Sequence, residues 1–326
     1  MRVAVLGATG AVGGMMLRVL EERNFPADEI VPLASARSAG TRVTWRGREW
    51  EVREPAPGVF EGCEIALFSA GATRSREWAP VAAAEGAVVI DNSSAWRMDP
   101  EVPLVVPEVN GARADVRPRG IIANPNCVAI QVVMALEALR RRVGLRRVVA
   151  STYQAVSGAG QKGIDALEAE LAGGRSENTP FVAPIAGNVI AQIGTFNAEG
   201  WTDEEEKLRD ETRKILSLPE LAVAATCVRV PVPVGHAASV TVELESPLTL
   251  EEARAAFRDM PGVVYTDESE RPPIPADVAG RDLVRVGRLR LDRDLPGVMH
   301  FWVVADNLRR GAATNAVQIA ELIGRG

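Results

Sequence analysis

A glycine-rich loop near the N-terminus constrains this chain most. Residues 2–6 form an apolar run typical of a strand inside a parallel sheet, and residues 15–20 favour a helix. Between them, Gly7, Gly10 and Gly13 recur every third residue. Strand, glycine turn and helix form the context that dinucleotide binding requires: the glycines allow a tight turn and close approach of a pyrophosphate, and the helix N-terminus attracts its charge. A packing loop without a ligand is the alternative, and the position directly after the first strand disfavours it.

Strand and helix patterns alternate through the rest of the N-terminal region. A helix is predicted at about 75–85. Alternation of this kind predicts a doubly wound α/β sheet, in which right-handed crossovers bring the strand ends to one edge. The further buried strands are predicted at residues 30–34, 65–71, 87–91 and 121–123, and Pro107–Asn110 is predicted to be a turn.

The pattern changes after the helix predicted at 127–140. Helices are expected at 162–171 and from Thr202 or Asp203 onward, and residues 173–200 show little periodicity. Long β-branched runs predict strands that complete an antiparallel set, at 147–156, 222–231, 236–245, 283–291 and 298–305.

Two domains are expected, because 326 residues exceed what one hydrophobic core usually serves. The C-terminal helix predicted at 310–322 closes the chain onto the first domain. We therefore expect one domain of residues 1–126 plus 307–326, which contains the glycine loop, and a second domain of residues 127–306.

Composition excludes several classes of protein. The formal net charge of −6 disfavours nucleic-acid binding, and no apolar run is long enough to span a membrane. The strand at residues 2–6 leaves no room for a signal peptide. The three cysteines are widely spaced and form no metal-ligand pattern, so we expect a reduced, cytoplasmic protein without a bound metal.

Cys127 is the candidate nucleophile. It ends the polar turn Asn124–Cys127, which separates the strand at 121–123 from the apolar helix that follows. A cysteine at a helix N-terminus meets free backbone N–H groups and the positive end of the helix dipole, which favour a thiolate. The alternative is a buried structural cysteine.

Polar residues at other strand ends suggest further ligand contacts. Ser35, Arg37 and Ser38 follow the strand at 30–34, where an NAD enzyme would place an acidic residue, so a cofactor with a 2′-phosphate, NADP, is predicted. Arg97 follows the strand at 87–91 and is a candidate anion contact. Ordinary surface arginines are the alternative for both.

Two histidines occur in the second region. His236 stands at the start of a strand, whereas His300 lies inside one and is interpreted as structural. Arg229 is two residues from Cys227 and therefore shares its face of a strand. Glu205 and Lys207 lie in an acidic run, whose usual meaning is a solvated helix face.

Seven short motifs occur in a characteristic order: Gly7–Gly13, Ser35–Gly40, Asp91–Arg97, Asn124–Cys127, Tyr153–Gly160, Arg229 with His236, and Asp306–Ala313. Together they resemble the aspartate-β-semialdehyde dehydrogenase family over nearly the whole chain. The resemblance implies a Rossmann-type NADP domain, an α+β catalytic domain and a homodimer. It also implies reversible, NADPH-dependent reduction of β-aspartyl phosphate to aspartate β-semialdehyde and phosphate through a cysteine thioester, a step in lysine, threonine and methionine biosynthesis.

The same resemblance implies roles for individual residues. Cys127 corresponds to the nucleophile and His236 to the acid/base, while Asn126 and the Cys127 backbone N–H suit the oxyanion. Substrate contacts are implied for Arg229 with the carboxylate, Glu205 with the ammonium, Arg97 and Lys207 with phosphate, and Gln154 near the nicotinamide. Cofactor contacts are expected from Gly7, Thr9, Gly10, Ala11, Val12, Gly13, Ser35, Arg37, Ser38, Ser69, Gly71, Ser157, Gly158, Asn307 and Gln318.

Three other functions are weighed against this one. N-acetyl-γ-glutamyl-phosphate reductase shares the chemistry, but an acidic residue for a free ammonium favours the aspartyl substrate. A short-chain dehydrogenase needs Tyr-x-x-x-Lys, and Tyr153 and Tyr265 are each followed four residues later by serine. A non-catalytic NADPH sensor remains open until activity is measured.

Overall fold

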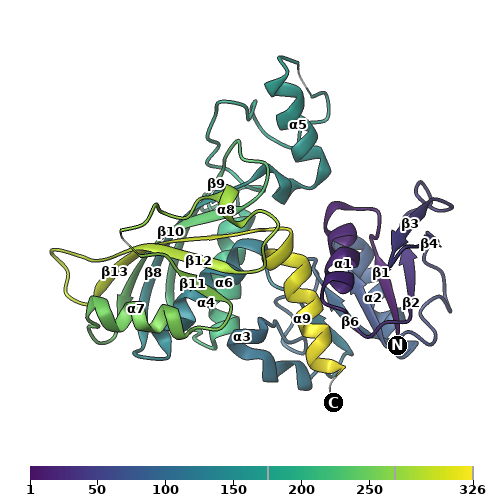
Figure 1. Cartoon of the computed structure of the whole chain (residues 1–326), viewed down its shortest axis with the longest axis horizontal. Coiled ribbons are helices and arrows are strands. Elements are labelled where there is room, and N and C mark those ends of the chain that lie inside the picture. The colour runs from purple at the N-terminus through teal and green to yellow at the C-terminus, as the bar shows by residue number, and fades with distance from the viewer. Residues whose placement is uncertain (175, 268, 325–326) are drawn as a thin grey trace. The chain divides into compact units, whose positions relative to one another are not determined.

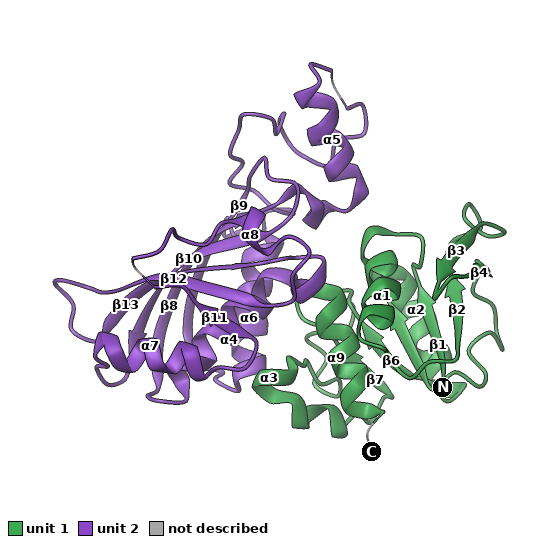
Figure 2. Ribbon diagram, viewed as in Figure 1, with its two compact units in different colours: residues 1–126, 312–326 green, residues 127–311 purple. Residues whose placement is uncertain are grey.

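The chain forms two compact units in a computed structural model that describes residues 1–174, 176–267 and 269–324. Unit 1 comprises Met1–Asn126 and Ala312–Gly326, and unit 2 comprises Cys127–Gly311 (Figure 2). The chain passes from unit 1 to unit 2 between Asn126 and Cys127, and returns after Gly311 rather than after residue 306.

Unit 1 is built on a five-stranded parallel sheet (Figure 1). Its order is β2 (Glu29–Leu33), β1 (Arg2–Leu6), β5 (Ile65–Phe68), β6 (Val88–Asp91), β7 (Ile121–Ala123). The doubly wound sheet expected from the sequence is therefore confirmed. The order reverses direction between β1 and β5, which makes the edge beyond these two strands the switch point where such sheets bind ligands.

Helices α1 (Ala11–Glu22) and α9 (Thr314–Ile323) contribute to the core of unit 1, together with strand β1. Met16 and Leu20 of α1, and Val317 of α9, are fully buried there. Each such side chain contributes about 1.5–3 kcal/mol through burial. Helix α2 (Ala72–Ala84) contacts β5 and β6. The C-terminal segment thus completes the first unit, and a short π-helix at Arg309–Ala313 precedes α9.

Unit 1 also contains elements that were not predicted from the sequence or were predicted differently. A hairpin joins β3 (Arg42–Trp45) to β4 (Arg48–Glu51) through Arg46 and Gly47, whose φ angles of 49° and 69° suit a two-residue hairpin turn. The turn expected at residues 107–110 is a short helix, α3 (Pro107–Asn110), which begins with proline at its first position.

Unit 2 is built on a six-stranded mixed sheet. Its order is β11 (Val263–Tyr265), β12 (Val284–Leu291), β13 (Val298–Ala305), β10 (His236–Leu244), β8 (Leu145–Gln154), β9 (Ala222–Arg229). The expectation of an antiparallel set was wrong for β9, which runs parallel to β8. Strand β11, which the sequence analysis did not predict, runs parallel to β12. The connection from β8 to β9 contains helices α5 (Gln161–Leu171) and α6 (Asp203–Leu216), and the connection from β11 to β12 contains α8 (Pro275–Val278), so neither pair is a hairpin.

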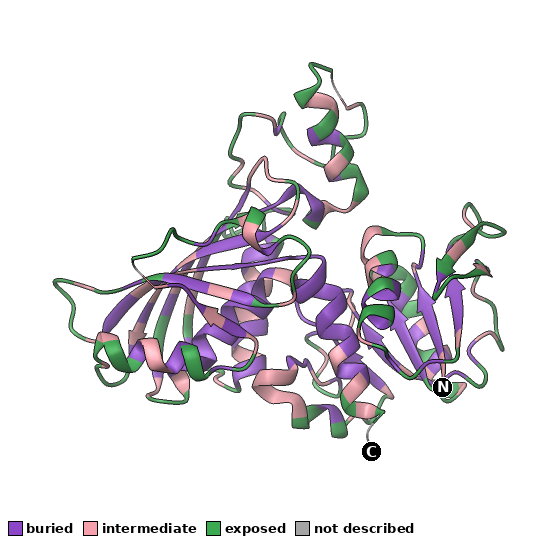
Figure 3. Ribbon diagram, viewed as in Figure 1, coloured by how far each residue is buried: buried purple, intermediate pink, exposed green. Residues whose placement is uncertain are grey.

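Helices α4 (Cys127–Arg140), α6 (Asp203–Leu216) and α7 (Leu250–Asp259) pack on the large sheet. Along β10 and β13, residues buried beneath this layer alternate with partly exposed ones (Figure 3). Helix α5 (Gln161–Leu171) stands apart from the sheet (Figure 1), and α8 (Pro275–Val278) contacts β13. Within the described parts of the chain, no helix combines the length and the apolar character needed to cross a bilayer.

Candidate active site

The glycine loop after β1 lies against the loop after β5, at the switch point of unit 1. A Cβ added to Gly7, whose φ is 93°, would collide with the carbonyl oxygen of Ser69. A Cβ on Gly13 would collide with the carbonyl of Gly7. These two positions therefore admit only hydrogen, because Gly7 packs against the loop after β5 and Gly13 packs against Gly7.

Gly10 has a different role, because a Cβ there would meet nothing closer than 3.3 Å. Gly10 is the N-cap of α1 and provides no side-chain cap, and the first turn contains no acidic residue. The first N–H groups of a helix lack partners within the helix and favour an anion. Thr9, on the loop, is exposed, and Ala11 and Val12, which begin α1, are partly exposed. This arrangement fits a dinucleotide pyrophosphate.

The neighbouring strand ends complete this edge. Ser35, Arg37 and Ser38 follow β2, which pairs with β1, and Arg37 is exposed. The Ser38 N–H donates to the carbonyl oxygen of Ser35 at 2.8 Å, which folds the segment into a turn. Gly71, with a φ of 84°, is the uncapped N-cap of α2. The turn after β2 therefore presents a cation and hydroxyls beside the glycine loop.

The guanidinium group of Arg97 donates hydrogen bonds to backbone carbonyl oxygens in unit 1. Its Nε donates to the carbonyl oxygen of Asn124 at 3.0 Å, and its Nη2 donates to that of Asn92 at 2.7 Å. The Asn124 side chain accepts from Asn315 Nδ2 at 2.6 Å. Arg97 thus ties together the segments that follow β6 and β7. It is 8% exposed, and Asn126 is likewise buried.

The side chain of Gln318, which was expected to contact the cofactor, forms a hydrogen bond to another residue of unit 1. Its Nε2 donates to Glu108 Oε1 at 3.0 Å, and this contact joins α9 to α3. The structure therefore gives the Gln318 amide a packing contact within unit 1.

In unit 2, the register of the large sheet brings distant residues to one end. Gln154 ends β8 and pairs with Arg229, which ends β9, while His236 begins β10 beside them. Helix α4, which starts at Cys127, packs on β8, β10 and β13. A Cβ on Gly311 would lie 3.0 Å from Cys127 Cβ, so the segment after β13 closes over the thiol side of the helix.

His236 and Arg229 share a backbone partner. The Ala155 N–H donates to His236 Nδ1 at 3.0 Å, and the Ala155 carbonyl accepts from Arg229 Nη1 at 2.6 Å. A Cβ on Gly158 would lie 2.8 Å from Arg229 Nη1 and 3.1 Å from His236 Nε2. Gly158 therefore lies beside both His236 and Arg229. These two side chains are the centre of a buried polar cluster around Ala155 in unit 2.

Burial and charge shape the electrostatics of the cluster. Burial lowers the pKa of Arg229, and the negative charges of Glu204 and Cys127 partly oppose that shift. Burial, and then Arg229, hold the pKa of His236 well below its ordinary value. Burial raises the pKa of the Cys227 thiol strongly, with a further contribution from Glu204. Cys227 therefore stays a thiol, whereas Cys127 is partly exposed at the helix start.

The acidic run places Glu204, not Glu205, toward this cluster. Glu205 belongs to a capping box with Thr202, and its Oε1 also accepts from the Cys227 N–H at 3.0 Å. Glu204 Oε1 accepts from Gln154 Nε2 at 2.9 Å, and its Oε2 lies 3.4 Å from Lys207 Nζ. The pattern Thr202-x-x-Glu205 is a capping-box signature, so the sequence contained the signal that separates the two glutamates.

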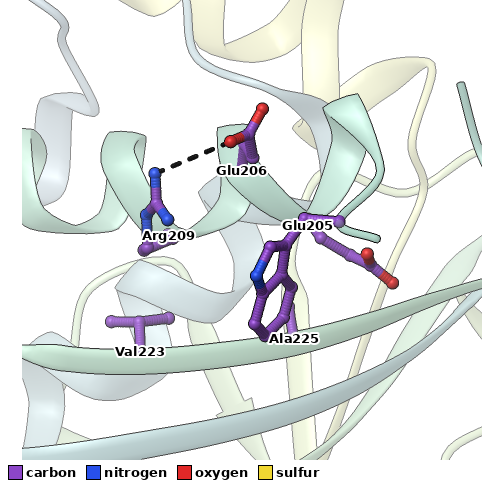
Figure 4. A pocket seen from close by; sticks show the side chains of 6 residues that line it. Glu205, Glu206, Arg209, Val223 and Ala225 are labelled. Atoms are coloured by element: carbon purple, nitrogen blue, oxygen red, sulfur yellow. Dashed lines mark ion pairs between the residues drawn. The ribbon is translucent and has the colours of Figure 1, made fainter. Parts of the chain in front are cut away.

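Glu205 also lines a small pocket formed by residues of α6, β9 and Trp201 (Figure 4). Its lining residues are Trp201, Glu205, Glu206, Arg209, Val223 and Ala225. Glu206 and Arg209 pair across its rim at 4.0 Å. Neither His236 nor Arg229 lines it, so it is separate from the cluster around Ala155.

Ser157 and Asn307, both expected at the cofactor, bind each other. The Asn307 Nδ2 donates to Ser157 Oγ at 2.9 Å, and Asn307 Oδ1 accepts from the Gly235 N–H at 2.9 Å. Because Gly235 precedes His236, this network holds the start of β10 against the loop after β8.

Semialdehyde dehydrogenases typically have a dinucleotide-binding site in one domain and a catalytic cysteine and histidine in the other. Unit 1 of this chain has a loop that fits a dinucleotide, and unit 2 has a cluster of cysteine, histidine, arginine and glutamate. Residues 2–116 match the family model described as "Semialdehyde dehydrogenase, NAD binding domain", and residues 136–310 match "Semialdehyde dehydrogenase, dimerisation domain". The chain therefore belongs to this class of nicotinamide-dependent oxidoreductases.

Comparison with individual relatives identifies the family within this class. An aspartate-semialdehyde dehydrogenase of Aquifex aeolicus is 51% identical, covering 99% of this chain and 97% of that protein. The crystal structure of aspartate-semialdehyde dehydrogenase II of Vibrio cholerae, complexed with ASA, has a TM-score of 0.96 and 46% identity over 99% of this chain and 98% of that chain. The enzyme of Candida albicans with NADP has a TM-score of 0.78 and 25% identity over 99% and 98%. The chain belongs to the aspartate-semialdehyde dehydrogenase family.

Proposed function

We propose that this enzyme reduces L-4-aspartyl phosphate to L-aspartate 4-semialdehyde and phosphate, reversibly and with NADPH. The observation that carries the proposal is the cluster in unit 2, which sets buried Arg229 and Glu204 beside a helix that begins with Cys127. An amino-acid substrate carries a carboxylate and an ammonium, and the cluster offers one side chain of opposite charge for each.

Substrate binding follows from these charges. Arg229 uses one nitrogen on the Ala155 carbonyl, which leaves its planar fork oriented for a carboxylate. Glu204, oriented by Gln154 and Lys207, is our revised candidate for the substrate ammonium in place of Glu205. This assignment also disfavours an N-acetylated substrate, whose nitrogen carries no charge to pair. Lys207 and Arg97 remain the proposed phosphate contacts.

Covalent catalysis divides the reaction into two steps. The thiolate of Cys127 attacks the acyl phosphate, phosphate leaves, and a thioester forms. Bound NADPH supplies the hydride that reduces this thioester to the aldehyde. The helix start at Cys127 favours the thiolate in both steps, and Asn126 with the Cys127 N–H are the proposed oxyanion donors.

NADP is the proposed form of the cofactor. The uncapped start of α1 fits the pyrophosphate, and exposed Arg37 with Ser35 and Ser38 fits a 2′-phosphate. The Candida albicans relative holds NADP. No acidic side chain follows β2 in the segment where an NAD enzyme binds the ribose 2′-hydroxyl.

The large sheet supplies the proposed homodimer interface. Ser151, Ser239 and Trp302 face one another across β8, β10 and β13 and are less buried than the opposite face. The dimerisation-domain match of residues 136–310 supports pairing through unit 2. Ser239→Arg should produce monomers in light scattering; a stable dimer would reject this surface. Because Cys63, Cys127 and Cys227 form no disulfide, we also propose a reduced, cytoplasmic location.

The direct test is phosphate-dependent formation of NADPH from aspartate semialdehyde, followed by absorbance. We expect activity that requires phosphate or arsenate. N-acetylglutamate semialdehyde serves as the competing substrate. Activity on that compound alone would overturn the proposal, and NADPH binding without turnover on either substrate would indicate a sensor.

A further inference from the structure

A segment that follows α5, residues 179–190, contacts Arg229 through both its main chain and its side chain. The Ile190 N–H donates to the Arg229 carbonyl oxygen at 2.9 Å, and the Arg229 N–H donates to that of Ile190 at 2.8 Å. Earlier in the segment, the guanidinium carbon of Arg229 lies over the ring of Phe181, 5.8 Å from its centroid. The segment therefore contacts this arginine at both of its ends.

Helix α5 fixes the position of this segment through a carboxylate. Glu170 Oε2 accepts from the N–H of Ile185 at 2.6 Å and from the N–H of Ala186 at 2.7 Å. Both residues lie between Phe181 and Ile190 in the chain. The two contacts with Arg229 are thus made on either side of one anchored turn.

The ring of Phe181 is itself held against α5. A Cβ on Gly163 would lie 3.2 Å from Phe181 Cζ, so glycine at this position lets the tip of the ring approach the helix. The ring also packs against an apolar cluster whose buried members are Val156, Leu167 and Ile185. Its orientation toward Arg229 is therefore determined by contacts with α5 and not by the arginine alone.

The environment of the Arg229 guanidinium group strengthens a contact of this kind. A cation is attracted to the face of an aromatic ring, and more strongly where water is excluded. Arg229 is 6% exposed, and burial lowers its pKa. Its Nη1 donates to the Ala155 carbonyl, and a Cβ on Gly158 would lie 2.8 Å from that nitrogen. Few orientations remain for the group, and ordering it before the substrate arrives reduces the entropy cost of binding.

We infer that Phe181 is a positioning residue for the substrate: its ring holds the Arg229 guanidinium group in the orientation that binds the substrate carboxylate. The inference rests on the proposed function, in which Arg229 receives that carboxylate. Phe181 acts through Arg229 and takes no part in the bond changes at the carbon that Cys127 attacks. Loss of the ring should therefore raise KM rather than lower kcat.

Replacement of the ring tests the inference. Phe181→Leu keeps an apolar side chain and removes the aromatic face. In the phosphate-dependent assay, KM for aspartate semialdehyde should rise about 3–30-fold, with kcat within about twofold of the wild-type value. Leu167→Val, which weakens the same apolar cluster from α5, is the matched control and should leave KM near the wild-type value. An unchanged KM in Phe181→Leu, or an equal rise in both folded variants, would overturn the inference.

A double-mutant cycle separates positioning from a general loss of structure. Arg229→Gln removes the cation, so the ring has no guanidinium group left to orient. Adding Phe181→Leu to this variant should change kcat/KM by less than about twofold, although the same substitution has its full effect in the wild-type background. Independent, additive losses would show that the ring acts elsewhere and would overturn the inference.

The wild-type enzyme distinguishes failure of the inference from failure of the proposed function. A wild-type protein without phosphate-dependent activity on aspartate semialdehyde would reject the proposed function and the inference together. An active wild-type enzyme whose KM is unaffected by Phe181→Leu would reject the inference alone.

Discussion

The edge of unit 1 that is proposed to bind the cofactor is built from backbone groups, whereas the cluster of unit 2 is built from side chains. The edge of unit 1 consists mainly of backbone: Gly7 and Gly13 pack loop against loop, and the uncapped start of α1 presents N–H groups. The cluster of unit 2 consists of buried polar side chains, and each of them is held by a neighbour, as Glu204 is by Gln154.

This difference predicts different responses to mutation. Backbone sites tolerate changes in most side chains but fail when a Cβ intrudes. Side-chain sites fail when one group is removed, because its partner then remains buried without compensation. Four experiments can test the contrast, in order of decreasing expected effect.

The first removes the nucleophile. Cys127→Ser should reduce phosphate-dependent NADPH formation by at least about 10³-fold, because a hydroxyl is a far weaker nucleophile than a thiolate. Binding of NADPH, followed by fluorescence titration, should be unchanged if the cofactor depends on unit 1. Cys63→Ala, a change at a buried cysteine of unit 1, is the control for loss of a thiol. Turnover near the wild-type rate in the serine variant would exclude Cys127 as the nucleophile.

The second experiment compares two glycines of one loop. Gly13→Ala introduces a Cβ that collides with the Gly7 carbonyl, so the free energy of unfolding should fall by about 1–3 kcal/mol or more in urea titrations. Gly10→Ala meets its nearest atom only at 3.3 Å and should affect stability much less. It should instead weaken NADPH binding, where a pyrophosphate needs close approach. Equal losses of stability would mean that the two glycines do not divide these tasks.

The third experiment compares adjacent glutamates. Glu204→Gln should reduce kcat/KM by about 10–100-fold, since a hydrogen bond to a charged group contributes about 1.5–3 kcal/mol. Glu205→Gln should reduce stability by about 0.5–2 kcal/mol through the damaged helix cap and leave KM near the wild-type value. Steady-state kinetics and urea unfolding of both variants measure these effects. The reversed pattern would restore Glu205 as the substrate contact.

The fourth and smallest effect concerns the cofactor. Arg37→Ala should decrease the preference for NADP over NAD by about tenfold, because a charged contact to the 2′-phosphate is lost on an exposed turn. Arg42→Ala is the matched control, since Arg42 is also exposed but pairs with Glu49. The ratio of kcat/KM for the two cofactors gives the result, and an unchanged ratio would reject Arg37 as the 2′-phosphate contact.

Much of unit 1 could be predicted because its determinants are contiguous. The glycine loop lies between the strand and helix that it joins, so pattern and position together indicate the fold. The hairpin of β3 and β4 escaped prediction because Arg46 adopts the positive φ of its turn in place of the usual asparagine or aspartate.

The cluster of unit 2 was harder to predict from the sequence. Cys127 could be placed at a helix start, and the family resemblance supplied His236 and Arg229. The resemblance gave Glu205 for the ammonium, whereas the helix cap uses that residue and turns Glu204 toward Gln154. The parallel pairing of β9 with β8, which aligns Gln154 with Arg229, depends on contacts between segments far apart in the chain.

Local order therefore determined the dinucleotide loop, the helix start at Cys127 and the capping-box pattern, because each depends on residues within a few positions of one another. Tertiary structure alone decided which glycines collide, how Gln154 comes to lie beside Arg229, and which backbone group contacts the ring of His236. The last of these depends on one backbone N–H, that of Ala155, brought against a ring 81 residues away. Every residue but proline carries such a group, so only the fold distinguishes this one.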